Sequence, residues 1–263
     1  MNFIRRFELR QVYHPWKEWE ASPADLGRAF EDVFITTPDG VKLSAWFFPA
    51  RDDSPRKDRA ILVCHGNSGN ISHRLELCRL LLGTGTAALV FDYRGYGRSG
   101  GEPGEEGTYV DAQAVYHWLR RRGFAARNII AFGESLGGAV AAELALREPV
   151  GGLVLQSTFT SIADVGAELL WWLPVRWINT IKYNTLGKLP RVKVPVLVMH
   201  SRADALVRFH HAEKNFTAAN GPKLFQETSG GHNYSVTLAP ELCAAGLEKF
   251  LSMLEGAGFK YSK

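Results

Sequence analysis

The sequence predicts an α/β fold, in which a mostly parallel, doubly wound sheet carries helices on both faces. Short apolar runs of strand length alternate with segments of helical periodicity along most of the chain. These runs are nearly continuous in apolar residues, which is typical of strands buried on both faces. We expect one domain over residues 31–263, preceded by an N-terminal extension over 1–30 and carrying a short cap insertion at about 158–190.

The elements follow one another in a regular order. Residues 31–37 and 41–48 flank the turn sequence Pro-Asp-Gly and predict an opening β-hairpin. Further strands are predicted at 60–64, 87–91, 128–132, 152–155, 194–199 and 223–226, and helices at 72–82, 109–122, 136–147, 210–219 and 240–254. Ligands of such sheets bind outside the carboxyl ends of the strands, so we look for chemistry just after each apolar run.

Charge and cysteine content exclude some classes of function. The formal net charge of +4 is spread along the chain, so nucleic acid is not an expected partner. Cys64, Cys78 and Cys243 are odd in number and have no metal-ligand spacing, so we expect reduced thiols, a cytoplasmic location and no metal. Residues 3–10 interleave apolar and arginine side chains, which leaves two alternatives: packing on the domain, or peripheral contact with a membrane surface.

One Gly-x-Ser-x-Gly sequence has the setting that a nucleophile requires. Residues 133–137 read Gly-Glu-Ser-Leu-Gly between a predicted strand and a predicted helix, which favours Ser135 as a nucleophile over a helix N-cap. The same pattern recurs at 97–101, but it lies in a glycine-rich loop well beyond its strand. We therefore expect Ser99 to be a turn residue.

An oxyanion hole needs two backbone N–H donors near the nucleophile. The residue after the serine supplies one, which here is Leu136. The loop after the strand at 60–64 should supply the second, and we choose the N–H of Asn67, with His65 in a structural role. The alternative is a glycine turn that only joins a strand to a helix.

The acid and the base should follow the serine along the chain, in that order. Asp204 lies in the loop after the strand at 194–199, and we prefer it as the acid to Asp164, which lies beside the cap. His232 follows two glycines after the last strand, so we expect it to be the general base.

The predicted cap is rich in aromatic residues. We expect Pro174 to bend it, with at least one tryptophan turned inward over the mouth near Ser135 and the others packed on the sheet. The alternative is that these tryptophans pack only on one another. The candidate pocket residues are Phe159, Trp171, Trp172 and Trp177.

Together these motifs resemble the α/β-hydrolase superfamily over about residues 31–255. The superfamily resemblance includes His-Gly-Asn at 65–67. The strings Asp-Tyr-Arg-Gly-Tyr-Gly at 92–97 and Gly-Glu-Ser-Leu-Gly-Gly at 133–138 look like its single-domain serine aminopeptidase-like branch, which includes depalmitoylase-like and esterase-like members. The resemblance implies an eight-stranded sheet with one antiparallel strand near the start, and no metal or organic cofactor. This sequence departs from the branch in two places. We expect no N-terminal membrane helix, and Ser-Arg-Ala-Asp-Ala-Leu-Val-Arg at 201–208 replaces the usual Gly-x-x-Asp-x-x-Val-Pro.

The residues predict a serine hydrolase that cleaves carboxylester or thioester bonds of a small-molecule or acylated substrate through an acyl-enzyme. An amidase or peptidase would use the same residues. A non-catalytic binding module is the alternative from another class.

Overall fold

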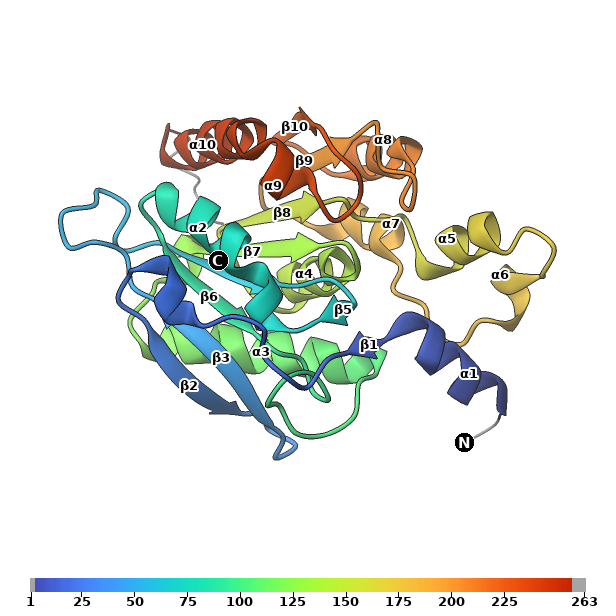
Figure 1. The fold of residues 1–263 in the computed structure, drawn as a ribbon. Coiled ribbons are helices and arrows are strands. Elements are labelled where there is room, and N and C mark those ends of the chain that lie inside the picture. The colour runs from blue at the N-terminus through green and yellow to red at the C-terminus, as the bar shows by residue number, and fades with distance from the viewer. Residues whose placement is uncertain (1–2, 257–263) are drawn as a thin grey trace.

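An eight-stranded sheet runs through the centre of the computed structural model, which describes residues 3–256 (Figure 1). The strands lie in the order β10-β9-β8-β7-β4-β6-β3-β2, and β3 alone runs antiparallel to its neighbours β2 and β6. Their bounds are β2 Glu31–Thr36, β3 Lys42–Phe48, β4 Ala60–Cys64, β6 Ala87–Phe91, β7 Ile129–Glu134, β8 Gly152–Gln156, β9 Val196–Ser201 and β10 Lys223–Thr228. The predicted eight-stranded sheet with one antiparallel strand near its start is confirmed.

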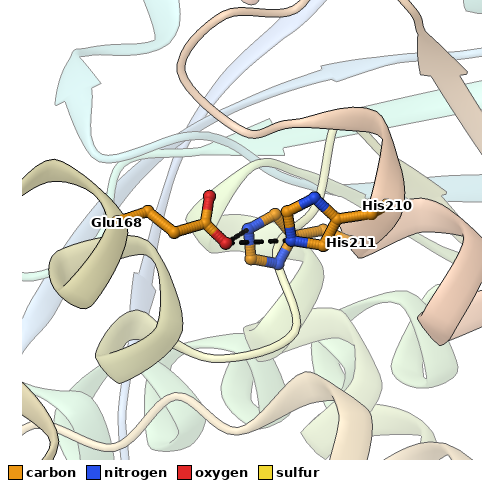
Figure 2. Close-up of side chains that lie close together, drawn as sticks. All are labelled: Glu168, His210 and His211. Atoms are coloured by element: carbon orange, nitrogen blue, oxygen red, sulfur yellow. Dashed lines mark ion pairs between the residues drawn. The ribbon is translucent and has the colours of Figure 1, made fainter. Parts of the chain in front are cut away.

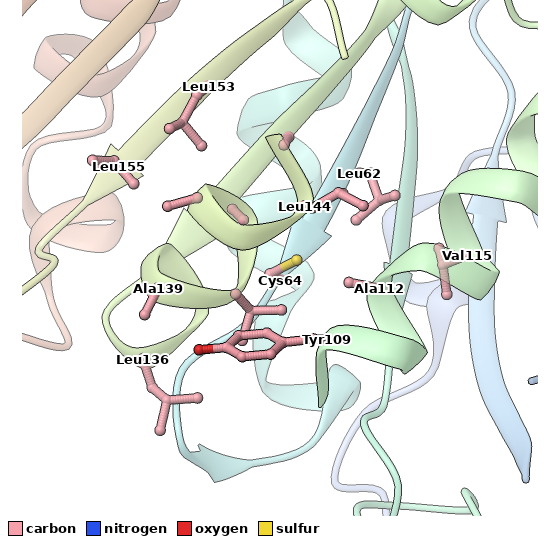
Figure 3. Close-up of a cluster of buried hydrophobic side chains, with 14 of the residues drawn as sticks. Leu62, Cys64, Tyr109, Ala112, Val115, Leu136, Ala139, Leu144, Leu153 and Leu155 are labelled. Carbon is pink, nitrogen blue, oxygen red and sulfur yellow. The ribbon is translucent and has the colours of Figure 1, made fainter. Parts of the chain in front are cut away.

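Both faces of the central strands are buried, as the apolar runs predict. Every residue of β4 is buried, and successive side chains alternate between two hydrophobic clusters: Leu62 lies in one and Val63 in the other. Helices α3 (Glu105–Arg121) and α4 (Leu136–Arg147) contribute to the first cluster (Figure 3). Helices α2 (Leu75–Gly83) and α10 (Pro240–Gly256) contribute to the second, so the sheet is covered on both sides.

Some elements extend beyond their apolar runs. Strands β7 and β9 continue for two residues past the predicted ends, because the polar pairs Glu134↔Gln156 and His200↔Glu227 keep the ladders in register. Helix α3 begins at Glu105, four residues before the predicted start. Gly104 precedes it, and acidic residues fill the first turn, where they interact favourably with the helix dipole.

The N-terminal segment packs on the domain. It contains α1 (Phe3–Val12), β1 (His14–Pro15) and η1 (Pro23–Leu26), and β1 pairs in parallel with β5 (Ser68–Gly69). Val12 and Tyr13 are buried in the first cluster, and the ring of Trp19 lies 4.7 Å from that of Trp46. No helix within residues 3–256 has the length and apolar character needed to cross a bilayer.

The cap leaves the sheet after β8 and returns before β9. It contains α5 (Ile162–Leu169), α6 (Val175–Ile178) and α7 (Thr185–Lys188). Pro174 caps α6, so the predicted bend is present. Figure 1 shows α5 and α6 standing out from the sheet on the same side as α1.

Candidate active site

Ser135 lies in a strained turn between β7 and α4. Its φ is 53° and its ψ is −117°, in the region of positive φ that side chains rarely adopt. The Ser135 N–H donates to the Gln156 carbonyl at 2.8 Å, and the Gly138 N–H donates to the Ser135 carbonyl at 3.0 Å. These bonds hold the strained residue between two strands and the first turn of the helix.

The glycines on either side of Ser135 are required by close backbone contacts. A Cβ on Gly133 would lie 2.4 Å from the Gly137 carbonyl oxygen, and a Cβ on Gly137 would lie 1.9 Å from the carbonyl oxygen of Cys64. Neither position has room for a methyl group, so the turn can form only with glycine there.

His232 connects Ser135 to Asp204. Its Nε2 lies 2.9 Å from Ser135 Oγ, and its Nδ1 lies 2.7 Å from Asp204 Oδ2. Because an ionised carboxylate can only accept, Nδ1 carries the hydrogen and Nε2 presents its lone pair to the serine hydroxyl. The structure thus brings together the three residues that the sequence analysis selected.

The Asp204 carboxylate is held by its own loop. Its Oδ1 accepts hydrogen bonds from the N–H groups of Leu206 at 3.0 Å and Val207 at 2.8 Å. Burial alone would raise the pKa of Asp204, but the hydrogen bond from His232 and the one from the Val207 N–H bring it below its usual value. The carboxylate is therefore ionised at neutral pH, and the unusual 201–208 sequence still presents it to His232.

A second histidine supports the acid loop without joining the chain of contacts. His200 Nε2 donates to the Val207 carbonyl at 2.7 Å and lies 3.5 Å from Asp204 Oδ2. Burial lowers the pKa of His200, so its ring is neutral. His200 fixes the position of Val207, whose N–H binds the acid.

The predicted oxyanion donors lie in loops that flank the serine. Leu136 is the first residue of α4, so its N–H has no partner within the helix. A Cβ on Gly66 would lie 3.6 Å from Ser135 Cβ, which brings the loop before Asn67 against the turn. His65 Nδ1 donates to the Gly66 carbonyl oxygen at 2.7 Å. In a trans peptide the N–H points opposite to the carbonyl, so the N–H of Asn67 points away from His65.

The N-terminal segment fixes this oxyanion loop, which the sequence analysis did not foresee. The Asn67 carbonyl accepts from the His14 N–H at 3.0 Å and from the Tyr96 hydroxyl at 2.7 Å. Its side-chain amide donates to the Val12 carbonyl at 2.8 Å. Three contacts thus immobilise the residue that we predict as a donor.

Arg74 is a second residue near the site that the sequence did not predict. Its Nε lies 2.8 Å from Glu134 Oε2, and its Nη2 donates to the Ser68 carbonyl at 3.0 Å. Glu134 immediately precedes Ser135, so Arg74 links the strained turn to the oxyanion loop. The available sequence signal was a glutamate directly before Ser135, and that signal does not identify the partner.

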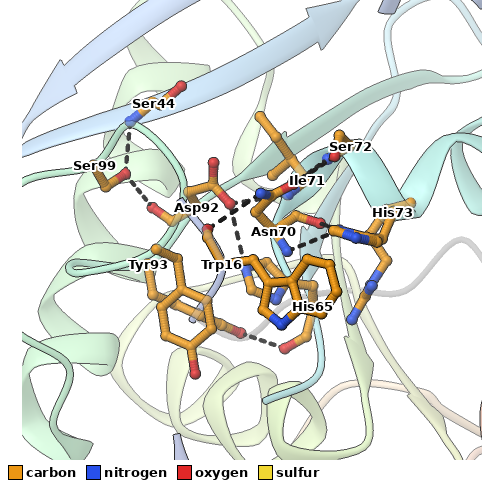
Figure 4. Close-up of polar contacts among 12 residues, drawn as sticks. Trp16, Ser44, His65, Asn70, Ile71, Ser72, His73, Asp92, Tyr93 and Ser99 are labelled. Atoms are coloured by element: carbon orange, nitrogen blue, oxygen red, sulfur yellow. Dashed lines mark hydrogen bonds and ion pairs between the residues drawn. The ribbon is translucent and has the colours of Figure 1, made fainter. Parts of the chain in front are cut away.

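Ser99 lies in a buried turn, as expected. Its hydroxyl donates to the Asp92 carbonyl at 2.7 Å and accepts from the Ser44 N–H at 2.8 Å (Figure 4). The Asp92 carboxylate accepts from the Ile71 N–H at 2.9 Å, and burial raises the pKa of Asp92 to about 7. This network braces loops and has no contact with His232.

The alternative acid, Asp164, belongs to the cap. Its carboxylate accepts from the hydroxyls of Thr160 at 2.7 Å and Ser161 at 2.8 Å, and it forms an ion pair with Arg176 at 3.0 Å. These contacts start α5 and connect it to α6. Asp164 is not in contact with His232.

The expectation for the cap tryptophans is wrong. Trp171, Trp172 and Trp177 are 83%, 65% and 90% exposed, so none is packed on the sheet or turned inward. Figure 1 shows the chain between α5 and α6 extending away from the sheet. Phe159 is buried in the first hydrophobic cluster and contributes to the core.

A cluster of two histidines and a glutamate ties the cap to α8 (Phe209–Ala218). Glu168 Oε1 lies 2.9 Å from His210 Nε2 and 3.3 Å from His211 Nε2 (Figure 2). Within residues 3–256 this is the one group with three metal-ligand atoms inside 4.8 Å of one another. Thr160 N–H donates to His211 Nδ1 at 3.2 Å, so the cluster also has contacts with the loop before α5.

The order of the sheet, its single antiparallel strand and the strained serine after β7 define an α/β-hydrolase. The chain belongs to the serine aminopeptidase family S33, whose sequence profile matches residues 55–186. It is 38% identical over 254 residues to an uncharacterized protein of Mycobacterium tuberculosis, covering 96% of this chain and 90% of that protein. It is 33% identical to the alpha/beta hydrolase domain-containing protein WAV2 of Arabidopsis thaliana, over 81% of this chain and 76% of WAV2.

Among solved structures, the chain is similar to the esterase Pf2001 of Pyrococcus furiosus. The TM-score is 0.75 with 26% sequence identity, and the alignment covers 91% of this chain and 98% of the esterase. The family and this neighbour identify the protein as a hydrolase.

The contact between Gly137 and β4 leads to a prediction about stability. Gly137→Ala should lower the free energy of unfolding by about 1–3 kcal/mol, because the new methyl group would push α4 away from Cys64. The matched control is Gly83→Ala, where a Cβ meets no atom within 4 Å. Urea unfolding compares the two, and equal midpoints would contradict the proposed packing constraint.

Proposed function

We propose that this protein is a serine hydrolase that cleaves carboxylester or thioester bonds through an acyl-enzyme on Ser135. The observation that carries the proposal is the continuous chain of hydrogen bonds from Ser135 Oγ through His232 to Asp204, at 2.9 and 2.7 Å. Such a chain activates a hydroxyl that is otherwise a weak nucleophile.

In the first step His232 Nε2 takes the proton of Ser135 as Oγ attacks the carbonyl carbon. The carbonyl oxygen becomes an oxyanion, which accepts hydrogen bonds from the N–H groups of Leu136 and Asn67. As the intermediate collapses, the alcohol or thiol leaves with the proton from His232. Water then attacks the acyl-enzyme, again with His232 as base, and releases the acid and free Ser135.

Asp204 acts through His232. Its buried, ionised carboxylate fixes the tautomer with Nδ1–H and stabilises the imidazolium that forms in both steps. None of these steps needs a metal or an organic cofactor.

The similarity to a solved structure described as an esterase supports the ester assignment. The family description, serine aminopeptidase, keeps an amidase or peptidase as the second candidate. The same groups would then have to protonate a poorer, amine leaving group. Parallel assays with chromogenic esters, thioesters and aminoacyl amides separate the candidates. A binding module alone has no need of a strained serine hydrogen-bonded to a histidine.

We further propose a small-molecule or acylated substrate, no nucleic-acid partner and a cytoplasmic location. Cys64, Cys78 and Cys243 are free and buried, which supports a reducing compartment.

The first test compares two serines. Ser135→Ala should abolish hydrolysis of a chromogenic acetyl ester while leaving the unfolding midpoint close to that of the wild type, since it removes one hydroxyl whose hydrogen-bond partner, His232, is only partly buried. Ser99→Ala should retain the rate but lose about 1–3 kcal/mol of stability, because the buried Ser44 N–H loses its acceptor. Retained turnover in Ser135→Ala, or a comparable loss in Ser99→Ala, would overturn the choice of nucleophile.

The second test compares two aspartates. Asp204→Asn should lower kcat by about 10³-fold to 10⁴-fold, because the amide no longer accepts the Nδ1 hydrogen as a carboxylate does. Asp164→Asn is the control and should keep kcat near the wild-type value, since Asp164 contacts only the cap. The reverse ranking would assign the acid to Asp164.

A further inference from the structure

Large apolar side chains are exposed together on the cap and on α1. We name them the cap face. None of its three tryptophans makes a ring contact with another aromatic residue within the described part of the chain. Its members are Phe7 (54% exposed), Leu169 (52%), Trp171 (83%), Trp172 (65%), Trp177 (90%) and Ile178 (45%). Large apolar side chains this exposed indicate an interaction surface.

Hydrogen bonds join α1 to the cap and make the cap face one surface. The Glu8 carboxylate accepts from the N–H of Thr180 at 2.8 and 2.9 Å and from the N–H of Ile181 at 2.9 Å. The hydroxyls of Tyr13 and Tyr183 lie 2.9 Å apart just behind them. Helix α1 is therefore held against the segment that follows α6, as Figure 1 also shows.

Positive charge surrounds the cap face. Arg5 and Arg10 on α1 are exposed, and within residues 3–256 no carboxylate lies at ion-pair distance from either. Arg176 and Lys182 add two exposed cations on the cap.

The nearby acids are already engaged. Glu8 binds backbone N–H groups, Asp164 is paired with Arg176, and Glu168 faces the histidines of α8. These carboxylates keep their negative charge, and the exposed cations with no carboxylate at ion-pair distance in the described part of the chain are Arg5, Arg10 and Lys182.

We propose that the cap face docks the protein peripherally on an anionic lipid bilayer. Tryptophan is enriched at the headgroup level of membranes, where its ring is apolar and its N–H stays hydrated. Exposed Arg and Lys beside apolar side chains are typical of surfaces that lie in the interface, and each cation near an anionic leaflet adds attraction. A second copy of the chain is the other occupant that this apolar surface could take, and the test below distinguishes it from a bilayer.

Docking in this way would hold the active site at the membrane. The cap follows β8, and the last residue of that strand, Gln156, accepts a hydrogen bond from the Ser135 N–H. Helix α1 is followed by β1, whose His14 N–H donates to the Asn67 carbonyl. Acyl groups anchored in the bilayer are then the substrate class. This last step rests on the proposed function, whereas docking does not.

The test measures binding of the full chain to vesicles. In a flotation assay, the wild-type protein should bind vesicles of phosphatidylcholine that contain roughly one-third phosphatidylserine. It should bind vesicles of phosphatidylcholine alone more weakly, and it should dissociate as the salt concentration is raised. The Trp171→Ala/Trp177→Ala variant should lose about tenfold or more in partitioning, and Arg5→Gln/Arg10→Gln should lose mainly the preference for anionic lipid. Phe34→Ala, which removes an exposed aromatic from β2 instead, is the matched control and should bind as the wild type does.

Two further measurements separate the outcomes. Ser135→Ala should bind vesicles as the wild type does. Every docking variant should hydrolyse a water-soluble acetyl ester at the wild-type rate. Loss of ester hydrolysis therefore tests the proposed function, and loss of vesicle binding tests the docking surface. Equal vesicle binding by the tryptophan variant and the wild type, or no binding by either, would overturn the proposal. A wild-type dimer that the tryptophan variant fails to form, without vesicle binding, would instead identify the cap face as an interface between copies.

Discussion

The close approach of the turn at Ser135 to strand β4 is the constraint on which the site depends. With no side chain at Gly133 or Gly137, the backbone can reverse within van der Waals contact of Cys64. This reversal holds Ser135 at a φ of 53° and starts α4 at the next residue. The strain is balanced by the sheet, because β7 is paired on both sides and cannot shift without breaking two ladders.

The other functional groups are positioned around this fixed point by contacts distant in sequence. Arg74 joins Glu134 to the oxyanion loop, and β1 clamps that loop through the Asn67 carbonyl. On the opposite side, the backbone of the acid loop binds Asp204 and orients His232 toward the serine. Each group is held by hydrogen bonds already present in the free protein, so little reorganisation is needed when charge develops during a reaction.

Local sequence signals were sufficient for the sheet and for the turn at Ser135, whereas the choice of Asp204 and His232 also needed the order in which this fold places an acid and a base after the serine. Strands buried on both faces require continuous apolar runs, and the glycines around Ser135 follow from short-range steric contacts that any such turn imposes. The contacts of Arg74 and of β1 could not be predicted, because a charge or a single strand does not specify a partner more than 50 residues away. The cap tryptophans were misplaced for a related reason: apolar character predicts burial only where another element covers the side chain, and the insertion leaves the sheet before reaching them.

Ser135 is tested most directly by covalent labelling with a fluorophosphonate, followed by mass spectrometry of the digested protein. We expect one adduct per chain, on Ser135, at a rate that falls sharply when His232 is replaced by alanine because the hydroxyl then lacks its base. An adduct on Ser99 or another serine, or an unreactive protein that is correctly folded, would contradict the choice of Ser135 as the nucleophile.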